Sequence, residues 1–211
     1  MPTETLTPQR SAEEARPHTE IHPLLAQRRS RRAFSAQPVE PAIMRSLLEA
    51  ARWAPSSMNE QPWSFILAMR QNQLEFQRLL DCLMDFNLRW AQHAPVLLLA
   101  VARSNFLASG ERNRHALYDV GQAVAALTCQ AIASSLSICQ MAGFDVQKAR
   151  SVFSIPADHE PVVVVAIGYQ GDPAILLEKT RQKELAPRTR NSLDRFVFEG
   201  KWGQPAPVAK Q

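Results

Sequence analysis

Two short clusters of arginine are the side chains in this sequence best suited to bind a small anion. Arg28–Arg32 reads RRSRR, and Arg188–Arg190 reads RTR about 160 positions later. Either cluster alone is typical of a solvated surface patch, and neither has the interleaved aromatic residues of a nucleic-acid site. Because guanidinium groups bind phosphate oxygens in pairs, we expect both clusters to converge on one phosphate, with Ser30 adding a hydroxyl donor. The sequence contains neither GxGxxG nor a Walker loop, so side chains must hold that phosphate.

A second candidate is the stretch APSSMNEQPW, residues 54–63, which is rich in neutral hydrogen-bonding groups and poor in charge. It separates a segment with apolar residues at helical spacing from SFILAMR, which is typical of a buried strand. A plain helix-to-strand connection needs few such groups, so the flanking segments alone do not explain this composition.

Other chemistries find little support. His18 and His22 are four residues apart, but Pro17 and Pro23 flank them and disfavour a helical metal pair, so no metal site is predicted. Cys82 has no activating partner nearby in the sequence and is more typical of a core residue than of a nucleophile. The three cysteines form no CxxC motif. We place Cys129 and Cys139 on one helix, too far apart to pair, which favours a reducing compartment and a cytoplasmic protein.

These candidates lie between strands and helices that alternate along the chain. The predicted strands are 64–69, 95–102 and 161–169, and the last, PVVVVAIGY, is apolar throughout and belongs in the middle of a sheet. The predicted helical segments are 20–30, 39–53, 71–92, 115–141 and 145–155, with Asp145 as the N-cap of the last. Alternation of this kind indicates an α+β or α/β domain, and no internal repeat is visible.

Residues 120–144 contain no charge and, as one helix, would be about 37 Å long, enough to cross a membrane. Gln122, Gln130 and Gln140, with many Ser, Thr and Ala residues, favour instead a buried central helix with close packing. So long an apolar helix in one domain is typical of a helix shared with a second subunit.

Length and composition agree with one domain. The chain has 211 residues, 45% of them hydrophobic, and a net charge of +4, too weak a bias to imply nucleic acid. We interpret residues 1–20 as a flexible polar tail without an apolar signal region, 21–205 as a single domain, and 206–211 as a tail. From about residue 171 the chain is polar and irregular and is expected to form an arm that wraps around something.

Five segments in this order resemble the FMN-dependent nitroreductase family over roughly residues 22–205. They are RRSRR, PSSMNEQPW, WAQHAPVLLLAVA, the run from YDVGQ to AGFD, and APRTRNSLDRFVFEGKWG. The resemblance implies an α+β fold with a mostly antiparallel central sheet flanked by helices. It also implies a long central helix at a homodimer interface and a C-terminal arm that wraps the partner.

The resemblance also implies cofactor-binding roles. Arg28, Arg29 and Ser30 would serve the phosphate and ribityl end of FMN, Arg32 the pyrimidine edge, and the turn at Ala142 and Gly143 would face flavin N5. The remaining FMN ligands would be Pro55, Ser56, Ser57, Asn59 and Gln61 in the loop, which in this family comes from the other subunit, and Arg188 and Arg190 at the phosphate. A pyrimidine edge presents alternating donors and acceptors without formal charge, which explains why the loop is neutral.

The implied function is an oxidoreductase that takes hydride from NADH or NADPH onto FMN and then reduces a nitroaromatic, a quinone or a similar electron-poor compound. No side chain is assigned as catalytic, because the flavin carries the chemistry. Two alternatives remain open at this point. A relative with the same fold can carry out another flavin reaction, such as reductive dehalogenation or flavin fragmentation, and a non-catalytic protein can simply bind FMN.

Overall fold

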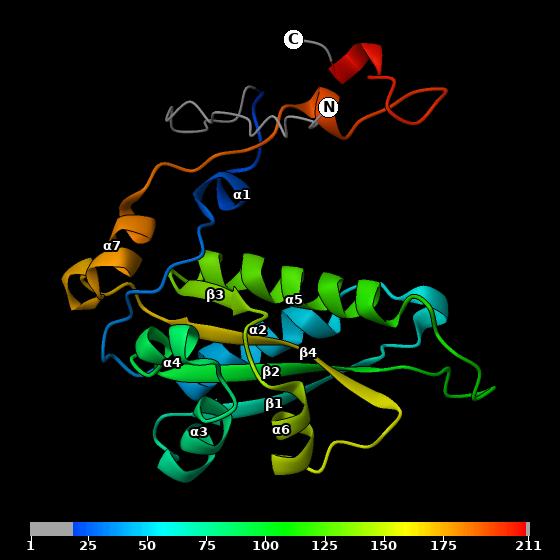
Figure 1. The fold of residues 1–211 in the computed structure, drawn as a ribbon. Coiled ribbons are helices and arrows are strands. Elements are labelled where there is room, and N and C mark those ends of the chain that lie inside the picture. Colours follow the sequence, from blue (N-terminus) through cyan, green and yellow to red (C-terminus); the bar gives the residue numbers. More distant parts are fainter. Residues whose placement is uncertain (1–18, 210–211) are drawn as a thin grey trace, which may run out of the picture. The chain divides into compact units, whose positions relative to one another are not determined.

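A four-stranded antiparallel sheet organises residues 21–184 in the computed structural model, which describes residues 19–209 (Figure 1). The strands are β1 (Trp63–Met69), β2 (Val96–Arg103), β3 (Ser137–Met141) and β4 (His159–Gly168), in the order β1-β2-β4-β3. The apolar β4 is therefore an interior strand, as predicted. β1 and β3 are the two edges, and this placement decides where the candidate site residues lie.

Helices cover both faces of the sheet (Figure 1). α2 (Pro41–Arg52) and α5 (Ala116–Ala133) cover one face, and α3 (Gln73–Leu80), α4 (Asp85–Ala91) and α6 (Val146–Val152) cover the other. Successive residues of β2 alternate between the two hydrophobic clusters, with Leu97 and Leu99 in one and Leu98 in the other. Both faces of β2 are covered, which agrees with its apolar residues from Val96 to Ala102. The α+β class predicted from the sequence is confirmed.

The local signals explain where the helices begin. Pro41 occupies the first position of α2, where no N–H is needed, and Met44, Leu47 and Ala51 follow at helical spacing on its buried side. Asp145 caps α6, since its carboxylate accepts a hydrogen bond from the Lys148 backbone N–H at 2.9 Å, and this predicted cap is confirmed.

The predicted helix over 115–141 extends too far, because its last part, 134–141, is not helical. α5 ends at Ala133, Ser135 turns into the left-handed region at φ 59°, and the chain returns as β3. The Leu136 N–H bonds the Ala131 carbonyl at 2.8 Å, which satisfies the end of the helix. The uncharged run therefore divides between a helix and an edge strand, and Cys139 lies on β3 and not on a helix with Cys129.

Two shorter helices complete this part of the chain. α1 (Pro23–Gln27) precedes the first arginine cluster, and α7 (Glu178–Leu185) lies in the stretch that we predicted to be irregular. α7 has no apolar periodicity, and its one buried side chain is Glu184. Hydrophobic pattern alone therefore does not reveal this helix.

Residues from Leu185 onward belong to a second structural unit. Within it, a bridge joins Phe198 to Pro205, and the Phe198 and Trp202 rings lie 5.1 Å apart in a tilted pair. Trp202 is 89% exposed. Residues 1–18 and 210–211 of the predicted tails lie outside the described residues, and Pro207–Ala209 form a short 3-10 helix, η4.

Over residues 19–209, no helix is both long enough and apolar enough to cross a bilayer. The three cysteines are free, and Cys82 and Cys139 are buried.

Replacing Leu98 with Ala should lower the free energy of unfolding by about 2–5 kcal/mol, because this fully buried side chain leaves a cavity against the α2–α5 layer. Urea unfolding at fixed protein concentration measures the change. Leu74→Ala is the matched control, since Leu74 is 70% exposed and its loss should cost no more than about 0.5 kcal/mol. Equal costs at both positions would contradict the described core.

The Cys139 thiol makes the free energy of unfolding depend on pH in the alkaline range. Burial raises the pKa of its thiol from 9.0 to about 11, aided by Glu184 and opposed by Arg32 and Arg28. The folded chain thus holds a proton that the unfolded chain releases near pH 9, so this contribution is complete below pH 9 and is lost as pH rises toward 11. Between pH 8 and 11 the wild type should lose up to about 2–3 kcal/mol more unfolding free energy than Cys139→Ala. Parallel losses in urea titrations of the two proteins would contradict the burial of this thiol.

Candidate functional site

The first arginine cluster lies along the free edge of β3. Ser30 forms a parallel bridge with Ile138, on the side of β3 that β4 does not occupy. The Arg28 guanidinium donates to the Ser30 hydroxyl at 3.3 Å. Arg28 and Arg29 are partly exposed and Ser30 is exposed, so this edge presents cationic and hydroxyl donors to a ligand.

A buried carboxylate anchors this cluster from α7. The Glu184 side chain accepts a hydrogen bond from the Arg32 backbone N–H at 3.0 Å and lies 3.9 Å from the Arg31 guanidinium. Its backbone carbonyl accepts from the Arg29 guanidinium at 3.5 Å. Because the Glu184 carboxylate is fully buried, these cationic partners offset the cost of removing its charge from water. The cluster is therefore held in a defined conformation.

Arg32 points toward the α4 side of the sheet. Its guanidinium carbon lies 5.9 Å from the centroid of the Trp90 ring, and Trp90 stacks on Phe34 with centroids 6.3 Å apart. Trp90 is 3% exposed, so it supports Arg32 from the core.

The turn at Ala142 and Gly143 lies on the same side of the sheet, against α4. A Cβ at Gly143 would come within 2.3 Å of the Phe86 ring and 2.7 Å of the Asn87 amide. The Gly143 carbonyl accepts from the Asn87 side chain at 3.0 Å and from the Met84 N–H at 3.2 Å. A side chain at this position would force the Phe86 ring and the Asn87 amide to move. The two hydrogen bonds hold the Gly143 carbonyl in place, while Ala142 remains exposed.

The predicted loop adopts an unusual backbone. Met58, Asn59 and Gln61 all have left-handed φ values, of 54°, 57° and 47°, although none is glycine. Within the loop, the Gln61 N–H donates to the Ser56 hydroxyl at 3.0 Å, and the Gln61 amide donates to the Asn59 carbonyl at 3.3 Å. Pro55, Asn59 and Gln61 are exposed and Ser56 and Ser57 are partly exposed, so the loop presents neutral groups outward.

Two carboxylates fasten this loop to the rest of the domain. Asp119, in the first turn of α5, accepts from the Ser57 backbone N–H at 3.1 Å. Glu60 turns inward and pairs with Arg103 of β2 at 2.6 Å, and the same guanidinium reaches the Glu60 carbonyl at 3.1 Å. The single charge of the loop is thereby neutralised inside the domain.

The two halves of the predicted site do not meet within one chain. The arginine cluster flanks β3, whereas the loop leads directly into β1, at the opposite edge of the sheet. These two edge strands are three strand spacings apart, about 14 Å. The two groups are also separated along the axis of α5. Ser57 bonds Asp119 near the start of this helix, whereas β3 follows the helix end, where Leu136 bonds Ala131. Asp119 and Ala131 are about 18 Å apart along the helix axis. Figure 1 shows β3 near one end of α5 and the loop after α2 near the other.

Arg188 and Arg190 lie in the structural unit that begins at Leu185. The Arg190 side chain is exposed and donates to the Thr189 carbonyl at 2.7 Å. No group of three or more His, Cys, Asp or Glu residues within 19–209 is arranged to hold a metal ion.

Sequence reasoning missed Glu184, Asn87 and Asp119. Glu184 and Asn87 contact their partners across more than 50 residues of chain, and no local pattern signals such contacts. Asp119 did carry a signal, because it is the last charge before the uncharged run that begins at Val120. A lone carboxylate at the start of an apolar helix indicates a specific hydrogen-bond partner.

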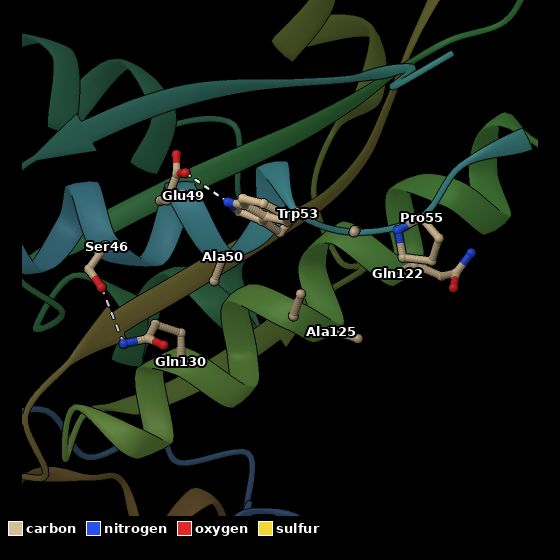
Figure 2. A pocket seen from close by; sticks show the side chains of 10 residues that line it. Ser46, Glu49, Ala50, Trp53, Pro55, Gln122, Ala125 and Gln130 are labelled. Carbon is tan, nitrogen blue, oxygen red and sulfur yellow. Dashed lines mark hydrogen bonds between the residues drawn. The ribbon is translucent and has the colours of Figure 1, made fainter. Parts of the chain in front are cut away.

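An open groove of about 540 Å³ runs beside the loop between α2 and α5 (Figure 2). Small residues, Ala50, Ala125 and Ala126, form part of its wall, and Pro55 of the loop lies at one end. Trp53 is 76% exposed, and its indole N–H donates to Glu49 at 2.9 Å. The pKa of Glu49 is lowered to about 2, first by Arg52 and then by Trp53. This face therefore exposes apolar surface that is continuous with the loop.

Comparison with known proteins places the chain in a family. The sequence profile of the nitroreductase family matches residues 25–169. An uncharacterised 15.4 kDa protein of Mycolicibacterium smegmatis is 37% identical over 117 residues, which cover 55% of this chain and 77% of that protein. A protein named NADH dehydrogenase from Thermus thermophilus is 26% identical over 176 residues, covering 69% of this chain and 84% of the relative.

A solved structure described as an oxidoreductase containing FMN is 29% identical, with a TM-score of 0.85 over 92% of this chain and 98% of the other. The sequence profile spans more than half of the protein and the fold agrees with it, so the chain belongs to the nitroreductase family.

Proposed function

We propose that this protein is an FMN-dependent NAD(P)H oxidoreductase that acts as a homodimer and passes electrons to nitroaromatics, quinones or similar electron-poor compounds. Family membership supports a flavin-dependent NAD(P)H oxidoreductase in general. The observation that carries the finer proposal is the separation of two anchored half-sites at opposite edges of one sheet.

The donor set of the first half-site fits the phosphate and ribityl end of FMN. Arg28 and Arg29 supply guanidinium groups, and Ser30 supplies a hydroxyl, along the exposed edge of β3. Arg32 would approach the pyrimidine edge from its support on Trp90, where positive charge favours the reduced flavin. Gly143, which has no Cβ, would allow the backbone to approach flavin N5 closely.

The second half-site fits the neutral ring edge. The exposed side chains of Asn59 and Gln61 can both donate and accept, as a pyrimidine ring requires. Because a single chain holds these groups far from its own arginines, we infer that each loop serves the flavin bound by the other copy.

The groove between α2 and α5 supplies the face on which that copy would dock. It is lined by small residues, it has the exposed Trp53 at its rim, and Pro55 joins it to the loop. A second copy that covers this face would bury the apolar surface. The same contact would bring the loop of one chain to the arginine cluster of the other. The C-terminal segment with Phe196, Phe198 and Trp202 would extend the interface as an arm around the partner.

FMN, when bound by these residues, would supply the hydride-transfer chemistry that links a reduced nicotinamide to the second substrate. The chain's own groups would bind and orient: the arginines hold the phosphate, the Gly143 turn fixes the ring face, and the loop holds the neutral edge. Arg188 and Arg190 would add contacts to the phosphate. We assign no side chain as a proton donor, since water can supply protons at an open site.

Purified protein should be yellow, should release FMN and not FAD on denaturation, and should oxidise NADH or NADPH in the presence of menadione. Chromatography of the released flavin and loss of nicotinamide absorbance at saturating menadione measure these properties. Release of FAD, or no flavin uptake from added FMN, would overturn the proposal. FMN binding without nicotinamide oxidation would leave a flavin-binding protein in place of an oxidoreductase.

Arg190→Ala should weaken FMN binding roughly ten- to a hundredfold, because it removes a charge-assisted contact to phosphate of about 1.5–3 kcal/mol. Flavin fluorescence quenching measures the dissociation constant. Arg195→Ala is the matched control, since it removes the same charge from an exposed position of the same segment. An FMN affinity within twofold of wild type for Arg190→Ala would show that Arg190 is only a surface charge.

A further inference from the structure

We propose that Asp119 is a positioning residue for the flavin site: through Ser57 it holds the loop of its own chain in the conformation that contacts the flavin of the other chain. This inference rests on the proposed function. Asp119 lies in the segment that begins YDVGQ, but it is not among the FMN ligands that the family resemblance implies.

Asp119 is buried and hydrogen-bonded to the loop. Its side chain is 2% exposed, and one carboxylate oxygen lies 3.1 Å from the Ser57 backbone nitrogen, 62 positions away in the sequence. A buried carboxylate is costly unless hydrogen bonds stabilise it, and the first turn of α5 adds the favourable field of a helix N-terminus. Neither feature is needed for helix packing, where an apolar residue would suffice.

The loop requires such an anchor because its own backbone is unfavourable. Met58, Asn59 and Gln61 all occupy the left-handed region without being glycine. Residues in this conformation persist only where surrounding bonds fix them, and they concentrate at ligand sites. The Ser56–Gln61 bond is internal to the loop, so it closes the turn without attaching it to the domain.

Asp119 and the Glu60–Arg103 pair attach this strained stretch to the rest of the domain. Asp119 fixes its beginning to α5, and Arg103 fixes its middle to β2. Ser57 directly precedes the left-handed pair Met58 and Asn59. Loss of the Asp119 bond would therefore release the exposed Asn59 side chain first, and the flavin of the partner chain would lose a preorganised contact.

The test compares FMN dissociation constants of wild type, Asp119→Ala and Asp119→Asn, with dimer content checked by sedimentation. The alanine variant should bind FMN roughly tenfold more weakly. The asparagine variant should stay within about threefold, because its side-chain oxygen can still accept from Ser57. Asp172→Ala is the matched control, since Asp172 also accepts a backbone N–H, from Ala174 at 2.8 Å, but at an exposed turn.

A mixed dimer separates positioning from general destabilisation. One chain carries Asp119→Ala and the other carries Arg28→Ala with Arg29→Ala, and differently tagged chains allow the mixed species to be purified. If Asp119 acts on the partner's flavin, one composite site is intact and the mixed dimer binds one FMN with wild-type affinity. Two weakened sites would show that Asp119 acts on its own chain's flavin and would overturn the inference.

The outcomes distinguish this inference from the proposed function. Wild-type binding of FMN together with unchanged affinity in Asp119→Ala overturns the positioning role alone. A wild type that takes up no FMN overturns the proposed function, and the positioning role with it. If Asp119→Ala does not fold, Asp119→Leu takes its place in the mixed dimer, since leucine fills the same buried position but cannot accept the hydrogen bond from Ser57.

Discussion

The sheet fixes the distance between the two groups of residues that the sequence offers for one ligand. β1 and β3 are its two edges, the loop leads into β1, and the arginine cluster flanks β3. Interior strands that are buried on both faces do not bend to close such a gap, and α5 lies along the sheet as a rigid spacer. The proposed function therefore depends on a second copy that would supply the missing half.

Each half is held by a buried carboxylate that lies outside the half itself. Glu184 accepts from the Arg32 backbone, and Asp119 accepts from the Ser57 backbone. Both carboxylates are almost completely buried, and both bond to backbone N–H groups, which fixes the course of the chain and leaves neighbouring side chains available. This arrangement separates the groups that shape the site from the groups that would contact FMN, so that substitutions of the two kinds should affect binding in different ways.

Sequence patterns predicted the parts of the fold that burial determines. The apolar runs of β2 and β4, the spacing of Met44, Leu47 and Ala51, and the Asp145 cap all act locally, and each is confirmed. The predicted end of α5 was wrong, because Ser134 and Ser135 end that helix at a position where glycine is the usual signal. α7 was missed because its single buried residue, Glu184, binds the arginine cluster and not a hydrophobic core.

The candidate site shows the same division. The family resemblance supplied the residues expected to contact FMN. Their placement at exposed edges is compatible with FMN binding, and this role stays a prediction. The anchors Asp119, Glu184 and Asn87 could not be predicted, because each depends on a contact between segments far apart in the sequence. Charge placement offered one clue, since Asp119 stands alone at the start of an uncharged helix.

The linkage between FMN binding and dimerisation tests the shared site most directly. Sedimentation velocity over a dilution series, with and without saturating FMN, measures it, and Ala126→Arg in the groove can bring dissociation into a measurable range. If each flavin needs groups from two chains, FMN must shift the equilibrium toward dimer, and FMN affinity must fall as the protein is diluted into monomer. A monomer that keeps one FMN per chain with undiminished affinity would contradict the shared site.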